Sequence, residues 1–180
     1  MYKNNTSKSK NVGMFFVGFA ILMFGMILMS SSMSPLAQNS EFAKFLTYFT
    51  NPVLGLLTGM IITAIIQSSA ASVGILQALA LSGGVSWAVA VPIIIGQNIG
   101  TCITSMLSAI GVNTAAKRVA VIHVSFNILG ALIFLPLYEV GHYFINSIPF
   151  NQTISPFGIA VFHSIFNIGT TVLLLPFAKA

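Results

Sequence analysis

Two neighbouring stretches decide the fold: residues 51–84 read NPVLGLLTGMIITAIIQSSAASVGILQALALSGG, and residues 85–110 read VSWAVAVPIIIGQNIGTCITSMLSAI. Each stretch places a short polar segment between two apolar arms, and no charged residue occurs from Phe45 to Ala116. Irregular backbone at membrane depth is tolerated only where it is buried in protein or lines a cavity. The pattern therefore predicts a re-entrant helical hairpin at 52–82, followed by a membrane span at 85–110 that is broken at its middle.

Composition places the whole chain in a membrane. Hydrophobic residues make up 56% of the 180 residues, charged residues make up 5%, and the mean hydropathy is +0.96. Soluble domains carry about 25% charged residues, so a soluble globular enzyme is excluded, and the apolar content also excludes disorder. Three further apolar runs predict spans at about 12–30, 119–137 and 157–177. A cleaved signal peptide is the competing interpretation of the first run, because basic residues precede it.

These elements predict an all-α polytopic membrane protein. It has about four membrane-crossing helices, one of them broken at its middle, plus one re-entrant helical hairpin. We expect a cytoplasmic polar tail at 1–11 and a single transmembrane unit at 12–180.

The few charged residues predict the orientation. Basic residues favour the cytoplasmic side, and this topology places there every basic residue except Lys44: Lys3, Lys8, Lys10, Lys117, Arg118 and Lys179. Both termini are then cytoplasmic, whereas Glu41 and Glu139 lie outside. The net charge of +5 is a topology signal and does not indicate a nucleic-acid partner. Two carboxylates and one cysteine, Cys102, offer little for acid–base, metal or redox chemistry, so we expect neither an enzyme nor a cofactor.

The two polar segments, Gln67-Ser68-Ser69 and Gln97 to Thr101, carry the chemistry. A helix break exposes N–H groups at the start of the second half-helix, which favour an anion. It also frees carbonyl groups at the end of the first half-helix, which suit Na⁺. The alternative is plain packing, since Gly55-x-x-x-Gly59 and Gly96-x-x-x-Gly100 are both helix-contact motifs.

A local repeat joins the last two spans. Residues 120–137 and 160–177 are identical at eight of 18 positions. In each copy a histidine and an asparagine are four residues apart, His123 with Asn127 and His163 with Asn167, so the two share a helix face. We expect these pairs to hydrogen-bond between the two spans, as contacts between helices in preference to substrate ligands.

These motifs resemble the type II sodium–phosphate cotransporter family, in its bacterial branch. The resemblance is carried by residues 59–72 (GMIITAIIQSSAAS), residues 96–104 (GQNIGTCIT) and the two His-Asn segments, and it runs from about Val17 to Phe177. In that family two inverted repeats each contain a Gln-Ser-Ser hairpin, and sodium and inorganic phosphate bind between them near mid-membrane. This chain has one copy of each motif, so it resembles the second inverted repeat only. Ala70 stands where the family usually has a third serine.

The resemblance implies sodium-dependent symport of inorganic phosphate across the plasma membrane, as one half of a two-repeat transporter. Na⁺ is then the coupling ion, and the partners are phosphate, Na⁺, the lipid bilayer and either a complementary repeat or further copies of this chain. The alternative is a truncated or split, non-transporting membrane subunit that needs a partner repeat, and a third reading is a small scaffold whose polar residues only pack. The expected ligands are Gln67, Ser68, Ser69, Gln97, Asn98 and Thr101, with Thr63 and Thr104 as second choices.

Overall fold

The computed structural model describes residues 3–37, 41, 48–81, 83–145 and 149–179. Within these ranges the chain is almost entirely helical and forms no strand beyond an isolated bridge between Ser86 and Thr153. By length and composition four segments could cross a membrane: Lys8–Met29, Trp87–Ser108, Thr114–Phe144 and Pro156–Phe177. The two shorter apolar helices between the first and second of these form the hairpin. The predicted fold class is therefore confirmed.

The hairpin consists of α3 (Pro52–Ile66) and α4 (Ser69–Leu81). α3 begins after Asn51, whose side-chain oxygen accepts hydrogen bonds from the N–H groups of Val53 and Leu54, and Pro52 fills the first turn. At 1.5 Å per residue the two arms are about 22 and 20 Å long, whereas the hydrocarbon core is ~30 Å thick. Each arm is thus too short to cross, as the re-entrant hairpin requires.

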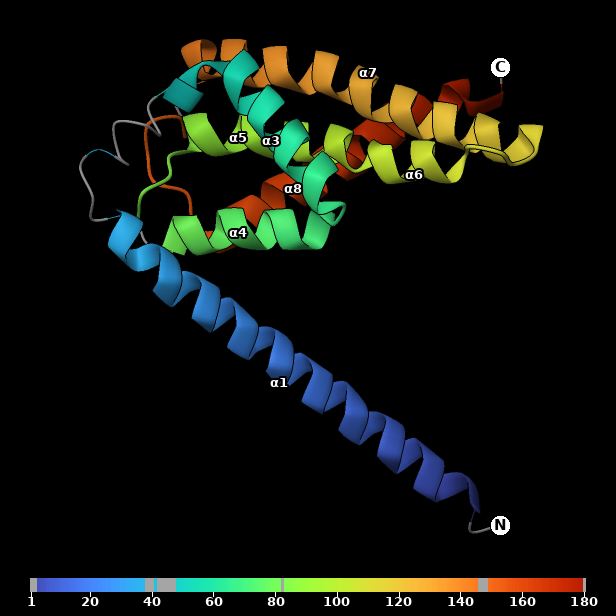
Figure 1. The fold of residues 1–180 in the computed structure, drawn as a ribbon. Coiled ribbons are helices and arrows are strands. Elements are labelled where there is room, and N and C mark those ends of the chain that lie inside the picture. The colour runs from blue at the N-terminus through green and yellow to red at the C-terminus, as the bar shows by residue number, and fades with distance from the viewer. Residues whose placement is uncertain (1–2, 38–40, 42–47, 82, 146–148, 180) are drawn as a thin grey trace.

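The next span runs through the middle of the bundle (Figure 1) as α5 (Trp87–Gly100) and α6 (Cys102–Ser108). Thr101 alone separates them. It keeps right-handed helical angles (φ −64°, ψ −21°), and its N–H donates to the carbonyl of Gln97 at 3.1 Å. The break in this span therefore releases few backbone groups, in contrast to our expectation for both polar segments.

Five further described elements pack on the hairpin, on this span or on one another. They are α1 (Lys3–Ala37), α7 (Thr114–Phe144), α8 (Pro156–Leu174) and two short 3₁₀ turns, η1 (Tyr48–Thr50) and η2 (Leu175–Lys179). α7 extends past both ends of the span predicted at 119–137, because the side chain of Asn113 caps it early and Pro136 does not end it. α1 likewise exceeds the run at 12–30, and the hydroxyls of Ser31 and Ser32 bond back to the carbonyl of Leu28. The division into tail and transmembrane unit stays a prediction.

α5 is the core of the molecule. Every residue from Ala88 to Asn98 is buried, and two apolar clusters form on opposite parts of the helix, both in contact with Trp87 and Phe162. α1, by contrast, projects away from the bundle (Figure 1), and its apolar side chains from Val12 to Leu28 are largely exposed. Only the later part of α1 meets the bundle, where it packs on α4.

Candidate functional site

Glycines let α3 lie directly on α5. A methyl group at Gly59 would overlap the carbonyl oxygen of Ile93, and one at Gly96 would overlap the carbonyl oxygen of Leu56. At Gly100 an added Cβ would lie 2.8 Å from the Cβ of Thr63. The two Gly-x-x-x-Gly motifs are thus packing motifs, as the alternative interpretation held. The same contact places the C-terminal end of α3 against the polar residues of α5.

A chain of buried hydrogen bonds ties the two hairpin arms to α5. The hydroxyl of Thr63 on α3 donates to the hydroxyl oxygen of Ser72 on α4 at 2.7 Å. The side-chain amide of Gln97 on α5 donates to the backbone carbonyl of Ser72 at 3.0 Å. All three residues are at most 3% exposed. The hairpin is therefore docked on the span by polar contacts as well as by glycine packing.

Gln97 also presents an unused acceptor. Its side-chain oxygen, Oε1, is buried and has no hydrogen-bond partner in the described part of the chain. Gln97 and Ser72 line a cavity of about 240 Å³ between α3, α4 and α5, together with Thr58 and otherwise mainly apolar side chains. An unsatisfied buried acceptor costs about 1–3 kcal/mol unless a donor or a cation meets it. This oxygen is therefore a candidate ligand for a cation.

Asn98 joins α5 to α8. Its side-chain oxygen accepts from Nε2 of His163 at 3.1 Å and from Nδ2 of Asn167 at 3.2 Å, while its own Nδ2 donates to the carbonyl of Ile94 at 2.8 Å. Because that oxygen can only accept, Nε2 of His163 carries the proton in this arrangement. Both the oxygen and the nitrogen of the Asn98 amide are thus hydrogen-bonded within the protein.

The second histidine of the repeat lies beyond Thr101. Nδ1 of His123 is 2.9 Å from the hydroxyl of Ser105 on α6. In both copies the asparagine amide donates to the carbonyl of its histidine, at 2.9 Å for Asn127 and 2.8 Å for Asn167. The pairs make contacts between helices, as we expected, but these two histidines contact the broken span and not the other copy. His163 contacts the span before Thr101, at Asn98, and His123 contacts it after Thr101, at Ser105.

The tip of the hairpin has the strongly broken backbone. Gln67 adopts a left-handed conformation (φ 58°), which is uncommon for a residue other than glycine, and its N–H donates to the carbonyl of Thr63 at 2.7 Å. The hydroxyl of Ser68 caps α4 by accepting from the N–H of Ala71 at 3.3 Å. The N–H groups of Ser68, Ser69 and Ala70 have no acceptor within the helix. The tip is therefore a helix N-terminus with free donors.

The predicted ligands fall into three places. Thr63, Gln97 and Asn98 are buried where α3 and α5 meet. Gln67 is exposed at the tip, with Ser68 and Ser69 half-buried beside it, and no hydrogen bond joins these three side chains to α5 within the described residues. The hydroxyls of Thr101 and Thr104 donate to the carbonyls three residues earlier, at 2.6 and 2.8 Å.

Sequence reasoning missed three residues of the site as ligands: Ser72, His163 and Asn167. Ser72 lies one turn after Ser69 and is polar within a charge-free stretch, which was the available signal. The contact of His163 and Asn167 with Asn98 joins residues more than 60 positions apart, so no local pattern reveals it.

Comparison with known proteins decides the family. A family model described as Na⁺/Pi-cotransporter matches residues 21–146, which is more than half of the chain. The chain belongs to the Na⁺/Pi-cotransporter family. This confirms the resemblance seen in the motifs, and the partial coverage fits a single repeat. No solved structure matches the chain.

Three relatives show what this member of the Na⁺/Pi-cotransporter family is similar to. It is 34% identical to the uncharacterized protein YqeW of Bacillus subtilis over 93% of this chain and 54% of YqeW. It is 39% identical to sodium-dependent phosphate transport protein 2A of Rattus norvegicus over 49% of this chain and 15% of that protein. It is 26% identical to YjbB of Salmonella typhimurium, provisionally named an inorganic phosphate export protein, over 96% of this chain and 32% of YjbB. The chain thus spans about half or less of the length of these relatives.

The role of Asn98 gives a first prediction. Asn98→Ala removes the acceptor shared by His163 and Asn167, and buried hydrogen bonds in membrane proteins contribute about 0.6 kcal/mol each, with a larger cost when a partner is left unsatisfied. We expect the free energy of unfolding to fall by roughly 1–3 kcal/mol. Titration with a denaturing detergent, followed by helical circular dichroism, measures it. Thr171→Ala, which loses an exposed hydroxyl bonded only to its own helix, is the control; an equal loss there would contradict the role of Asn98.

Proposed function

We propose that this chain forms one half of a sodium-coupled symporter of inorganic phosphate in the plasma membrane. The family is a transporter family, and the chain is a multi-pass membrane protein. One observation carries the proposal: glycines hold the hairpin, with its broken polar tip, against α5, where the side-chain oxygen of Gln97 has no partner among the described residues. In transporters of this build, discontinuous helices supply the substrate and ion sites.

Phosphate binds at the hairpin tip in this proposal. The free N–H groups at the start of α4 and the positive end of its dipole favour an anion. Two side chains add donors. Ser69, the first residue of α4, offers its hydroxyl, and Gln67, the left-handed residue at the tip, offers its amide. Ser68 is partly committed to capping, so it contributes less. Ala70 offers only its backbone N–H.

Na⁺ binds on the α5 side of the hairpin in this proposal. Oε1 of Gln97 is a carbonyl oxygen without a partner, and the hydroxyl oxygen of Ser72 retains a lone pair after accepting from Thr63. The hydroxyl proton of Thr101 points to the backbone carbonyl of Asn98, so its oxygen is left as an acceptor, whereas Thr104 lies on α6 and lines a separate hollow. A cation near these oxygens raises the affinity of the neighbouring tip for phosphate. No covalent chemistry and no cofactor other than the coupling ion takes part.

The site needs a complementary half. Gln67 is exposed at the tip, and a polar group facing lipid is costly, so a second repeat must cover it. Alternating access in inverted-repeat transporters rocks one repeat against the other around a site at their interface. Without that half the chain is a membrane subunit that does not transport, which is the second candidate function.

The test of the site is phosphate binding in sodium. Gln67→Ala removes an exposed side chain, so we expect the fold to stay intact. The affinity for labelled phosphate, measured on the chain assembled with its complementary half, should fall about tenfold or more. A tenfold loss corresponds to about 1.4 kcal/mol, which is the contribution of a hydrogen bond. Gln77→Ala is the matched control, because Gln77 lies on α4, the second arm of the same hairpin, and bonds the carbonyl of Pro156, away from the tip. Unchanged phosphate binding by Gln67→Ala would remove Gln67 from the site.

The proposed orientation gives a further prediction. In a Cys102→Ala background, a cysteine placed at Lys117 should react with a membrane-impermeant thiol reagent from the cytoplasmic side only, and one placed at Glu41 from the outside only. Intact cells and inside-out vesicles distinguish the two sides. External labelling at position 117 would overturn the cytoplasmic assignment of both termini.

A further inference from the structure

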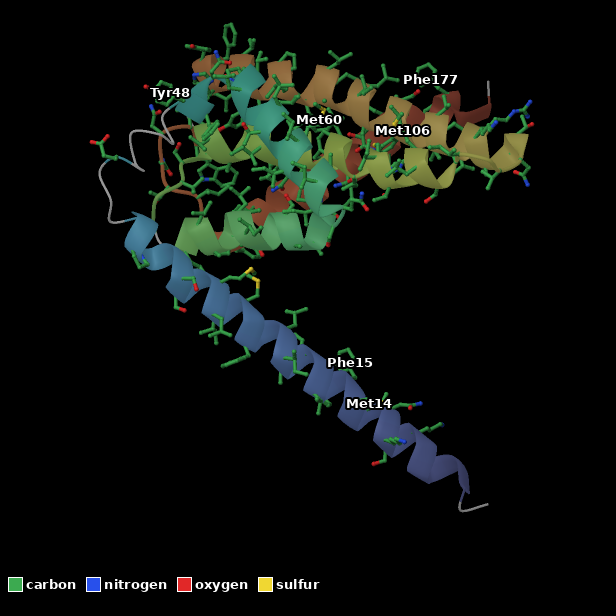
Figure 2. All side chains as sticks on the ribbon, in the orientation of Figure 1. Met14, Phe15, Tyr48, Met60, Met106 and Phe177 are labelled. Carbon is green, nitrogen blue, oxygen red and sulfur yellow. The ribbon has the colours of Figure 1, made fainter. Side chains whose placement is uncertain are left out.

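An open groove lies between α6 and α7 at their connecting turn, away from the hairpin. Its volume is about 560 Å³. From α7 it is lined at positions 117, 120, 121 and 124, which form one face of the helix, and from α6 and the turn mainly by Met106, Ala109 and Ile110. Figure 2 labels Met106, which lines the groove from α6. Met106, Ile110 and Val121 are 50%, 74% and 64% exposed, so the groove opens to the outside of the protein.

The groove is apolar along its length and basic at its end. Its polar side chains are Lys117 and Ser125, and Arg118 follows Lys117 on the same turn of α7. Both basic side chains are exposed. The chain has two acidic residues, and neither is near in sequence: Glu41 precedes η1, and Glu139 follows Lys117 by 22 residues on α7, about 33 Å along the helix. This positive end therefore has no acidic side chain on α6, the turn or the first turns of α7.

A neighbouring hollow on the other side of the α6–α7 contact shows the difference in chemistry. That hollow, of about 420 Å³, carries the hydroxyls of Thr104, Ser105 and Ser108 beside the apolar side chains of Ala109, Ala116, Val119 and Ala120. The apolar groove does not suit a free phosphate, because the anion would lose its hydration against Met106 and Ile110 without gaining donors. A ligand that fills the groove needs an apolar tail and an anionic head.

We propose that this groove binds an anionic phospholipid. An acyl chain lies along Ile110, Val121 and Val124, and the headgroup phosphate meets Lys117 and Arg118 at the membrane edge. Basic pockets between membrane helices select anionic headgroups, and burial of the chain adds the hydrophobic contribution. Long basic side chains place their charge at the interface while their stems cover apolar surface, which is the arrangement of Lys117 here. The site is independent of the proposed phosphate and sodium site.

The test compares the purified chain in nanodiscs of phosphatidylcholine with and without one fifth phosphatidylglycerol. We expect phosphatidylglycerol to raise the thermal unfolding midpoint of the unmodified chain by roughly 4 °C at low salt. A double variant, Lys117→Gln with Arg118→Gln, should lose this shift. Lys8→Gln with Lys10→Gln removes the same charge from exposed positions on α1 and should keep it. Circular dichroism before heating verifies that each variant is folded.

Filling the groove tests the acyl chain separately. Val121→Trp should lose the shift although both basic residues remain, whereas Val140→Trp, at an exposed position elsewhere on α7, should keep it. Inorganic phosphate at millimolar concentration should leave the shift unchanged. The proposal would be overturned if the shift survived both Val121→Trp and the Lys117/Arg118 variant, or if the Lys8/Lys10 control lost it equally. It would also be overturned if phosphate abolished the shift, which would indicate a site for the free anion.

Discussion

Gly96→Ala should prevent the hairpin from docking on α5. The added methyl group would overlap the carbonyl oxygen of Leu56, which belongs to the backbone of α3 and cannot rotate away. Alanine is the better helix former by about 1 kcal/mol, so any loss of stability must come from this overlap. Overpacking costs 1–3 kcal/mol in ordinary cores and more where backbone must move, and we expect at least about 3 kcal/mol here. Yield of monodisperse protein and unfolding in denaturing detergent measure the effect.

Gly18→Ala is the matched control for this experiment. Gly18 lies inside α1, and a methyl group added there meets no atom within 4 Å. The same chemical change should therefore leave stability unchanged or slightly raised, because only the helix propensity is altered. If Gly96→Ala were as stable as Gly18→Ala, the close approach of α3 and α5 would be wrong, and so would the site that depends on it.

The 180-residue chain reconstituted alone should show no sodium-driven phosphate uptake above background. Its tip presents Gln67 outward, and the oxygen of Gln97 has no partner among the described residues, so only part of a binding site is present. A single repeat also has no second repeat against which to move. Uptake of labelled phosphate into proteoliposomes under an inward sodium gradient measures the activity. Co-reconstitution with a chain that carries the complementary Gln-Ser-Ser repeat should produce it.

A homodimer could replace the complementary half only if two copies insert in opposite orientations. The basic residues argue against this, because those at both ends of the chain and the pair at Lys117 and Arg118 favour one orientation. Robust uptake by the purified chain alone would contradict our expectation and would indicate a dimer of dual topology. If the chain alone bound phosphate without taking it up, the result would be consistent with a half-transporter. It would show that the binding residues are assigned correctly although the transporter is incomplete.

Much of the fold follows from local sequence. An apolar run long enough to cross hydrocarbon is a property of consecutive residues, so the spans at 12–30, 119–137 and 157–177 could be predicted, although α1 and α7 extend past those bounds. The hairpin could be predicted because Gln67-Ser68-Ser69 interrupts two arms that are each too short to cross. Its N-terminal start is equally local, since Asn51 and Pro52 supply the cap and the first turn.

The second break was harder to judge from sequence. A glycine-bounded polar segment such as Gly96 to Thr101 is typical of an opened helix, yet Thr101 stays helical and its hydroxyl satisfies the carbonyl of Asn98. Whether a helix opens depends on what packs around it, and here α3 closes on Gly96 and Gly100. The polar side chains of this span, and not its backbone, are therefore what it contributes to the site.

The sequence by itself determined that this chain has the composition of a membrane protein, that its charge-free middle forms a hairpin and a polar span, and that its motifs resemble those of the Na⁺/Pi-cotransporter family. These follow from composition, run length and short motifs, which act over neighbouring residues. Only the tertiary structure decided that Ser72 links the hairpin to Gln97, that Asn98 is held by His163 and Asn167, and that no described residue bonds the side-chain oxygen of Gln97. Those facts depend on distances between residues far apart in the chain, because a side chain capable of binding an ion can equally be used up by a neighbouring helix.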